Sequence, residues 1–206
     1  MATPKSPFIV VPNFISAKQC EQIVDDLGFY HADTNADGDP IKMMRHHELH
    51  EEWLFERWQQ LQPDALQYYD AQYRGTEHFQ FEYLTQGVSC KPTCDNSQYI
   101  NKKWVRTKDR DFTGIVFLTD YNENVPFDSD YEVYGGKLEF PQHQFGFNPI
   151  RGTLIMFPAG PHFIHANAPI IAGDLFQAKF HVAATVPYLY QPADFPGDYK
   201  TWFKDL

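Results

Sequence analysis

The sequence predicts a mainly β protein with N-terminal helices, in which a double-stranded β-helix (jelly roll) packs against those helices. Apolar residues recur at helical spacing only in the first third of the chain. Beyond about residue 78, short segments rich in aromatic and β-branched residues follow one another, each bounded by Gly, Pro, Asn or Asp. The 206 residues contain no internal repeat or low-complexity linker, which predicts a single domain over residues 1–206.

Two helices are expected before the strands begin. The first covers 17–28, where Ser16 is a plausible N-cap and Gly28 is a stop signal. Its apolar face consists of Cys20, Ile23, Val24 and Leu27. The second helix lies within 45–62, and Pro63 is expected to end it, because the residue before a proline disfavours helical geometry.

Five strands are expected in the remainder: HFQFEYL (78–84), FTGIVFLT (112–119), GGKLEFP (135–141), GTLIMFP (152–158) and LFQAKFHVAATV (175–186). Alternation in the last strand places Phe176, Ala178 and Phe180 on one face and Leu175, Gln177, Lys179 and His181 on the other. If the apolar face meets the helices, the polar face points into the roll and indicates a binding site. The alternative is that the polar face points to water.

Charge and cysteine content narrow the classes of function. The net charge of −10 argues against a surface that binds nucleic acid non-specifically. Three irregularly spaced cysteines do not form a disulfide framework, and the N-terminal MATPKSPFIVVPNF lacks the long apolar run of a signal peptide or membrane span. We therefore expect a cytoplasmic protein that binds neither nucleic acid nor membrane. The basic stretch NKKWVRTKDR (101–110) is expected to form a solvated hairpin, with a partner site as the alternative.

Three local motifs are similar to metal sites but lack ligands. Segment 33–44 begins like a calcium loop, yet its twelfth position is methionine instead of glutamate, so a polar turn is expected. His46 and His50 lie one helical turn apart without the HExxH arrangement of zincins. Cys90 and Cys94 have no second pair of cysteines or histidines with which to hold a structural zinc ion.

One further constellation joins two distant segments. Asp95 lies in TCDNS and His165 in FPAGPHFIHANAP, in strands that a jelly roll can bring together. A carboxylate and an imidazole suit ferrous iron, which facial-triad oxygenases hold with two histidines and one carboxylate. Residues 93 and 95 share one side of an extended segment, so Thr93 stands where the missing imidazole belongs. His162 is the alternative ligand to His165 if the strand register is shifted.

From Tyr83 onward the chain resembles the iron(II)- and 2-oxoglutarate-dependent dioxygenases of the prolyl-hydroxylase type. TCDN matches their His-x-Asp-Asn motif with Thr93 in place of histidine. FTGIVFLTDYN is similar to their strand Thr-x-x-x-Tyr-Leu-Asn, with Thr113 retained and Phe117 in place of tyrosine. GGKLEFP and GTLIMFPAGPHFIHANAP match their Gly-Gly-x-Leu-x-Phe turn and the strand that leads to the distal histidine, His165. The N-terminal FIVVPNFISAKQCEQIV is similar to their strand-then-helix lead-in.

This resemblance implies Fe(II), 2-oxoglutarate and O2 as cofactors, and hydroxylation of a C–H bond in a peptide or small molecule. Asp95 and His165 would be the catalytic metal ligands, and Thr93 would mark the vacant histidine position. Tyr83 and Thr113 match positions that contact 2-oxoglutarate in relatives, although a core position is equally expected for Tyr83.

The chain departs from the family's pattern at the 2-oxoglutarate anchor. The usual Arg or Lys, nine or ten residues after the distal histidine, is replaced by Asp174 and Leu175. Lys179, which shares its strand face with Gln177, is the nearest cation that could pair with the far carboxylate of the cosubstrate. The resemblance therefore implies a relocated cosubstrate site that includes Gln177 and Lys179.

The same departures support a rival hypothesis, a binding domain that kept the jelly roll and lost its metal. In that case the Lys179 ammonium neutralises Asp95 in place of the cation, and no cofactor binds. The loop NENVPFDSDYEVYGG (122–136) is expected to border the mouth of the roll. Its acidic residues suggest a basic or peptide substrate, or else they are merely solvated.

Overall fold

The structure is a computed structural model that describes residues 5–28, 43–45, 48–88 and 90–203. Its helices are α1 (Ala17–Gly28), α2 (Glu48–Tyr68) and α3 (Tyr199–Trp202). Its strands are β1 (Ile9–Val11), β2 (Met43–Arg45), β3 (Tyr73–Thr76), β4 (Gln80–Leu84), β5 (Ser97–Ile100), β6 (Lys103–Arg106), β7 (Phe112–Phe117), β8 (Asp120–Tyr121), β9 (Glu132–Gly135), β10 (Leu138–Phe140), β11 (Phe145–Phe147), β12 (Leu154–Pro158), β13 (Ala166–Asn167), β14 (Ile170–Gly173) and β15 (Leu175–Ala184). Short 3-10 segments cover Pro141–His143, Pro161–Phe163 and Pro192–Asp194.

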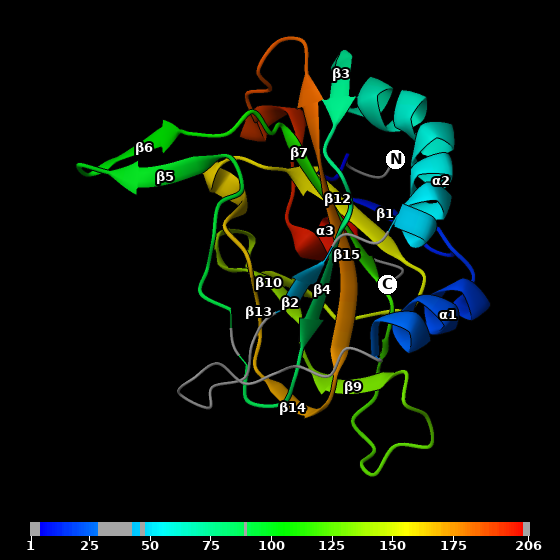
Figure 1. Cartoon of the computed structure of the whole chain (residues 1–206). Coiled ribbons are helices and arrows are strands. Elements are labelled where there is room, and N and C mark those ends of the chain that lie inside the picture. Colours follow the sequence, from blue (N-terminus) through cyan, green and yellow to red (C-terminus); the bar gives the residue numbers. More distant parts are fainter. Residues whose placement is uncertain (1–4, 29–42, 46–47, 89, 204–206) are drawn as a thin grey trace.

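The strands form a jelly roll built on one large sheet. Its strand order is β1-β12-β7-β15-β4-β2, with β3 pairing to the far end of β15. Two smaller sheets, β11-β10-β13 and β14-β9-β8, pack their apolar side chains against one face of the large sheet. Helices α1 and α2 cover the other face (Figure 1). The predicted fold class, a mainly β jelly roll with helices on one outer face, is therefore confirmed.

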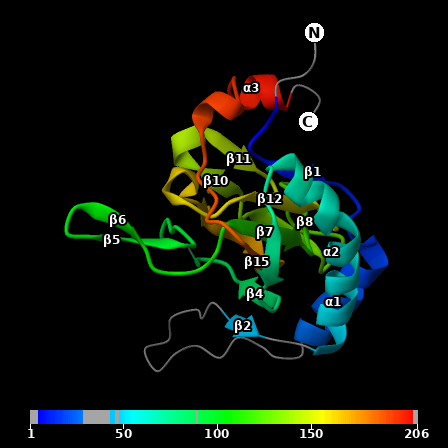
Figure 2. The same cartoon turned by 90° about the horizontal axis from the view of Figure 1, so that it is seen from above.

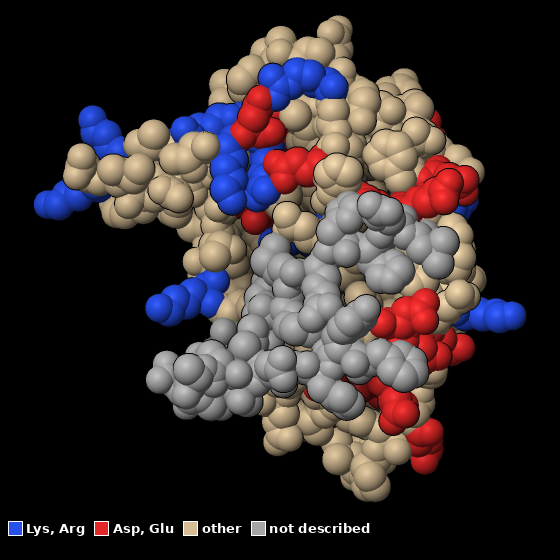
Figure 3. Space-filling model, in the orientation of Figure 1, with Lys and Arg blue, Asp and Glu red and all other residues tan. Residues whose placement is uncertain are grey.

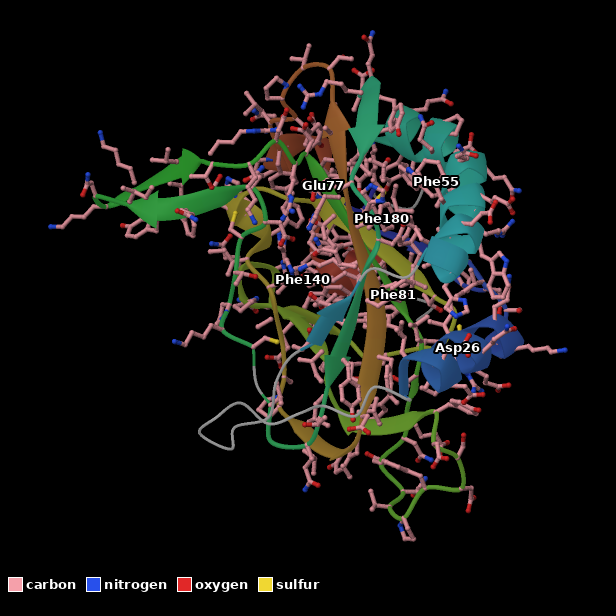
Figure 4. The ribbon with its side chains drawn as sticks, in the orientation of Figure 1. Asp26, Phe55, Glu77, Phe81, Phe140 and Phe180 are labelled. Atoms are coloured by element: carbon pink, nitrogen blue, oxygen red, sulfur yellow. The ribbon has the colours of Figure 1, made fainter. Side chains whose placement is uncertain are left out.

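Two apolar clusters follow from this layering. The cluster between the helices and the large sheet includes Phe81 and Phe180, and the cluster inside the roll includes Phe140 (Figure 4). Seen from above, α1 and α2 lie along one side of the molecule and the β5-β6 hairpin projects from the other (Figure 2). The basic stretch 101–110 thus contributes to a solvent-exposed hairpin, as predicted.

Helix α1 begins at the predicted cap. The Ser16 hydroxyl accepts a hydrogen bond from the Gln19 N–H at 3.3 Å, and the Gln19 side chain accepts one from the Ser16 N–H at 3.0 Å. This reciprocal arrangement is a capping box, which satisfies N–H groups that have no partner within the helix. On the same helix, the Asp26 carboxylate (Figure 4) lies 2.7 Å from Nε2 of His50 and so links α1 to α2.

The prediction that Pro63 ends the second helix is wrong, because α2 continues to Tyr68. The residues beyond the proline are anchored by packing: Ala65, Leu66 and Tyr69 are buried in the cluster beneath the helices. The Tyr69 hydroxyl also donates to the Pro7 carbonyl at 2.9 Å. Tertiary burial here outweighs the local cost of the proline.

Some expectations concern residues that the structure does not describe. Residues 33–42 of the calcium-like segment and His46 lie outside the described residues, whereas Met43 and Met44 belong to β2. Cys90 and Cys94 are free thiols. In the described parts of the chain, every helix is too short or too polar to cross a membrane.

Candidate functional site

The central strand β15 carries the polar face of the candidate site. Phe176, Ala178 and Phe180 pack into the cluster beneath the helices, so the alternate residues of β15 point into the roll. Gln177 and His181 are almost fully buried there. The interpretation that the polar face points inward is confirmed, and the alternative that it points to water is wrong.

Lys179, Asp95 and His165 meet inside the roll. The Lys179 Nζ atom lies 3.3 Å from Oδ1 of Asp95 and 3.3 Å from Nε2 of His165. Nε2 of His165 lies 3.5 Å from Oδ2 of Asp95. The exposed fractions of the three side chains are only 11%, 8% and 4% in the order Lys179, Asp95 and His165. A carboxylate, an imidazole and an ammonium therefore share one nearly dry location.

The imidazole of His165 is oriented by its backbone surroundings. Its Nδ1 lies 3.0 Å from the Phe163 carbonyl, which can only accept, so Nδ1 carries the proton. Nε2 then presents its lone pair to the Lys179 ammonium. Phe140 and Phe157 flank the ring at centroid distances of 5.7 and 5.0 Å. Burial, reinforced by the Lys179 charge, lowers the pKa of His165 to about 4, so the ring is neutral near pH 7.

Asp95 remains ionised despite its burial. Burial alone raises the pKa of this carboxyl, but the Lys179 ammonium, the two histidines and the Thr113 hydroxyl outweigh that effect and hold it well below its usual range. Thr113 donates to Oδ2 of Asp95 at 2.7 Å. The same hydroxyl lies 3.2 Å from Nδ1 of His181, which therefore acts as the donor to Thr113. Thr113 thus uses its one proton on Asp95.

Gln177, two residues before Lys179 on β15, belongs to a second group of buried polar side chains. The Gln177 amide donates to Glu82 at 2.6 Å and to Asn167 at 3.2 Å. The Glu82 and Asp95 carboxylates together more than offset the effect of burial and raise the pKa of Lys179 above its ordinary value. Sequence reasoning missed Glu82, although alternation in QFEYL places it on the face opposite Phe81 and Tyr83.

Thr93 is paired with His165 by backbone hydrogen bonds. The two residues form an antiparallel bridge in which each N–H donates to the other's carbonyl, at 2.9 and 3.0 Å. Side chains of directly opposed residues point to the same face with Cβ atoms about 5 Å apart. Thr93 is therefore on the same side as the His165 ring, but it remains exposed to solvent.

Three other candidate positions do not join the cluster. Tyr83 lies on the opposite face of the sheet, where its partly buried ring packs against the core 4.6 Å from that of Phe176, so the expectation that it faces the site is corrected. Leu175 is buried in the apolar interior of the roll. His162 is exposed and packs on Tyr190 at 5.4 Å, while His165 takes the position beside Asp95.

The residues present do not fit a facial-triad iron site. Within the described residues, no group of three or more His, Cys, Asp or Glu side chains is arranged to hold a metal ion. Asp95 and His165 supply two donors, but the Lys179 ammonium contacts both of them and would repel a second cation. The neutral Thr93 hydroxyl is a poorer donor than the imidazole that the arrangement lacks.

Similarity to known proteins is found at the level of structure. No protein-family model matches the chain, and no curated protein matches it. A viral collagen prolyl hydroxylase from Paramecium bursaria Chlorella virus 1, solved as a complex with 2-oxoglutarate, superposes with a TM-score of 0.64 over 88% of this chain and 97% of its own, at 18% identity. The chain has the fold of the prolyl hydroxylases.

Two further structures with this prolyl-hydroxylase fold come from other sources. A prolyl-4-hydroxylase from Pseudomonas putida gives a TM-score of 0.58 at 11% identity, covering 86% of this chain and 92% of its own. A prolyl hydroxylase from Trichoplax adhaerens, in complex with a hypoxia-inducible-factor peptide fragment, gives a TM-score of 0.60 at 12% identity. The superposition covers 98% of this chain and 88% of the other. At these identities the similarity establishes the fold, and the chemistry has to be argued from the site itself.

Proposed function

We propose that this chain is a dioxygenase-like binding domain in which the Lys179 ammonium takes the place of a metal ion. One observation carries the proposal: Nζ of Lys179 lies 3.3 Å from a carboxylate oxygen of Asp95 and 3.3 Å from the free ring nitrogen of His165. These are the two groups that the family resemblance assigns as metal ligands.

The ammonium meets the chemical needs of both groups. A buried carboxylate requires a compensating positive charge, and Lys179 supplies one at hydrogen-bonding distance from Asp95. The lone pair on Nε2 of His165 requires a donor, and an ammonium has three N–H bonds to offer. A metal ion would have to displace a charged group that is already held by Asp95.

The second candidate function is an iron(II)- and 2-oxoglutarate-dependent hydroxylase acting on a peptide or small molecule, with a weakened metal site. The observation that supports it is the Thr93–His165 backbone bridge, because directly opposed residues have side chains on the same face. In that case Lys179 would turn away from Asp95 to pair with 2-oxoglutarate, and Gln177 and Thr113 would contact the cosubstrate. Both residues instead already have partners, Glu82 and Asp95 respectively.

An anaerobic titration with Fe(II) and 2-oxoglutarate separates the two functions. We expect the natural chain to show no visible charge-transfer band of the iron chelate and no metal-dependent rise in melting temperature. A ligand that binds only the folded state at 100 times its Kd would stabilise the protein by about 2.7 kcal/mol, so real binding would be detected. A band or such a rise in the natural chain would overturn the proposal and favour the hydroxylase.

Matched variants test whether Lys179 is the residue that prevents iron binding. Thr93→His restores the third imidazole but leaves the ammonium, whereas Thr93→His combined with Lys179→Ala also removes the competing charge. We expect iron binding only in the double variant, with Lys179→Ala alone as the control. Iron binding by Thr93→His alone would show that Lys179 does not occupy the metal's place, and a double variant that folds without binding iron would show that the site is misplaced.

A further inference from the structure

The β5-β6 hairpin projects from the body of the protein (Figure 2). Among the strands that the structure describes, these two pair only with each other, from Ser97 opposite Arg106 to Ile100 opposite Lys103. Asn101 and Lys102 form the tip with φ values of 50° and 63°, as in the tight turns that match the twist of a hairpin. An isolated two-stranded hairpin is marginally stable in water, so this arm is suited to packing against a partner.

The hairpin combines exposed apolar surface with positive charge. Tyr99 and Trp104 share one face with ring centroids 5.3 Å apart, and they are 63% and 42% exposed. Lys102 and Lys103 stand at the tip, and residues 97–106 include no carboxylate. In the part of the chain that the structure describes, neither lysine takes part in an ion pair that would neutralise it. A partner surface that complements this hairpin would carry aromatic rings and carboxylates.

Such a surface exists on the opposite side of the same molecule. A cavity of about 830 Å³ lies between α1, the loop before β9 and the beginning of β15. Four carboxylates line it, from Asp25, Asp130, Glu132 and Asp174, together with aromatic rings that include Phe127 and Tyr131. Among the described residues that line this cavity there is no lysine or arginine. The loop 122–136 therefore contributes Asp130 and Glu132 to a surface next to α1.

Two of the cavity carboxylates accept hydrogen bonds within the molecule: Glu132 from the Asn122 amide at 3.0 Å, and Asp25 from the Tyr131 hydroxyl at 2.8 Å. In Figure 3 most lysine and arginine atoms lie at the hairpin and around its base, where acidic residues stand among them, and the α1 side is mainly acidic. Figures 1 and 2 place the hairpin and α1 on opposite sides, so the hairpin of a molecule does not reach its own cavity.

We propose that this chain associates with itself head to tail, the β5-β6 hairpin of one copy entering the α1–β9 cavity of the next. The tip lysines of the hairpin face the four carboxylates, and Tyr99 and Trp104 pack on the aromatic wall. Because the two surfaces are different, the contact is heterologous and extends into a ring or an open chain. A single hairpin that enters a single cavity makes a small contact, and small contacts belong to the weak, transient class of interfaces. This association does not depend on whether the site at Lys179 binds metal.

Sedimentation velocity across a concentration series tests the association. We expect the natural chain to grow beyond a dimer as concentration rises. Lys102→Glu with Lys103→Glu damages only the hairpin, and Asp25→Asn with Asp130→Asn damages only the cavity; each pair should weaken self-association at least tenfold. A charge-matched control, Lys91→Glu with Lys200→Glu, changes exposed lysines outside both surfaces and should associate like the natural chain.

Mixing the two damaged variants gives the decisive result. One still has an intact cavity and the other an intact hairpin, so an equimolar mixture should form a 1:1 dimer that does not grow further. A mixture that stays monomeric while the natural chain associates would overturn the head-to-tail arrangement. A natural chain that stays monomeric up to about millimolar concentration, where even contacts of about −4 kcal/mol are populated, would overturn the association itself.

Discussion

At the scale of single residues, Lys179 determines the character of the candidate site. Sequence alternation was sufficient to place it on the inward face of β15, with Gln177 and His181 on either side. It was not sufficient to show which group the ammonium contacts, because a lysine side chain has several rotatable bonds and Asp95 lies 84 residues earlier in the sequence. Burial decides the outcome: inside the roll an ammonium and a carboxylate that can reach one another will pair.

We expect Lys179→Met to lower the free energy of unfolding by about 3–5 kcal/mol, since it leaves the buried Asp95 carboxylate without its counter-charge. Asp95→Asn should destabilise the protein for the reciprocal reason. Combined, the two substitutions should cost clearly less than the sum of the single effects, because no uncompensated charge remains. Urea denaturation of the four proteins measures this coupling, and strictly additive effects would mean that the pair is not formed.

At the scale of elements, tertiary packing keeps α2 helical beyond a proline and brings a side chain close to the backbone of β7. Pro63 removes one helical hydrogen bond, a loss of about 3 kcal/mol in an unsupported helix, yet the following turn is retained because it buries Leu66 and Tyr69. In β7 the cause is space: the ring of Phe180 from β15 lies directly over Gly114. A glycine in the middle of a buried strand is thus required by its neighbour.

Gly114→Ala should therefore lower the stability of the fold by about 1–3 kcal/mol, because its Cβ would overlap the Phe180 ring within a closely packed core. Gly75→Ala in β3 is the matched control, since an added Cβ there meets no heavy atom within 4 Å. Thermal unfolding followed by circular dichroism compares the two. Equal melting temperatures for the two variants would contradict the packing described for β7 and β15.

At the scale of the whole molecule, the distribution of charge sets how the protein responds to pH. The chain carries a net charge of −10, while its interior holds His165 and His181 as neutral rings. Burial lowers the pKa of His165 to about 4 and that of His181 to about 3. In the unfolded chain both titrate near about 6.5, so below that pH the unfolded state binds more protons than the folded state.

Stability should consequently fall as the pH is lowered from 6.5 to 4, by about 1.4 kcal/mol per pH unit for each of the two histidines. Asp95, whose pKa is depressed, keeps its contribution above about 3.9, and Lys179, whose pKa is raised, keeps its contribution below about 10.4, so neither changes in this window. His181→Gln should reduce the slope by one histidine's share. Parallel stability profiles for the variant and the natural chain, measured by urea denaturation, would contradict a neutral His181.

The amino-acid sequence by itself predicted two long helices ahead of a β half, the jelly roll and the inward polar face of β15, because hydrophobic periodicity and turn residues are local signals. It also marked Asp95, His165 and Thr93 as neighbours, through motif order alone. Only the tertiary structure decided that Tyr83 faces the helices, that Glu82 faces Gln177, and that Lys179 reaches between Asp95 and His165. Those outcomes depend on strand register, burial and the reach of long side chains. All three are determined jointly by residues that are distant in the sequence.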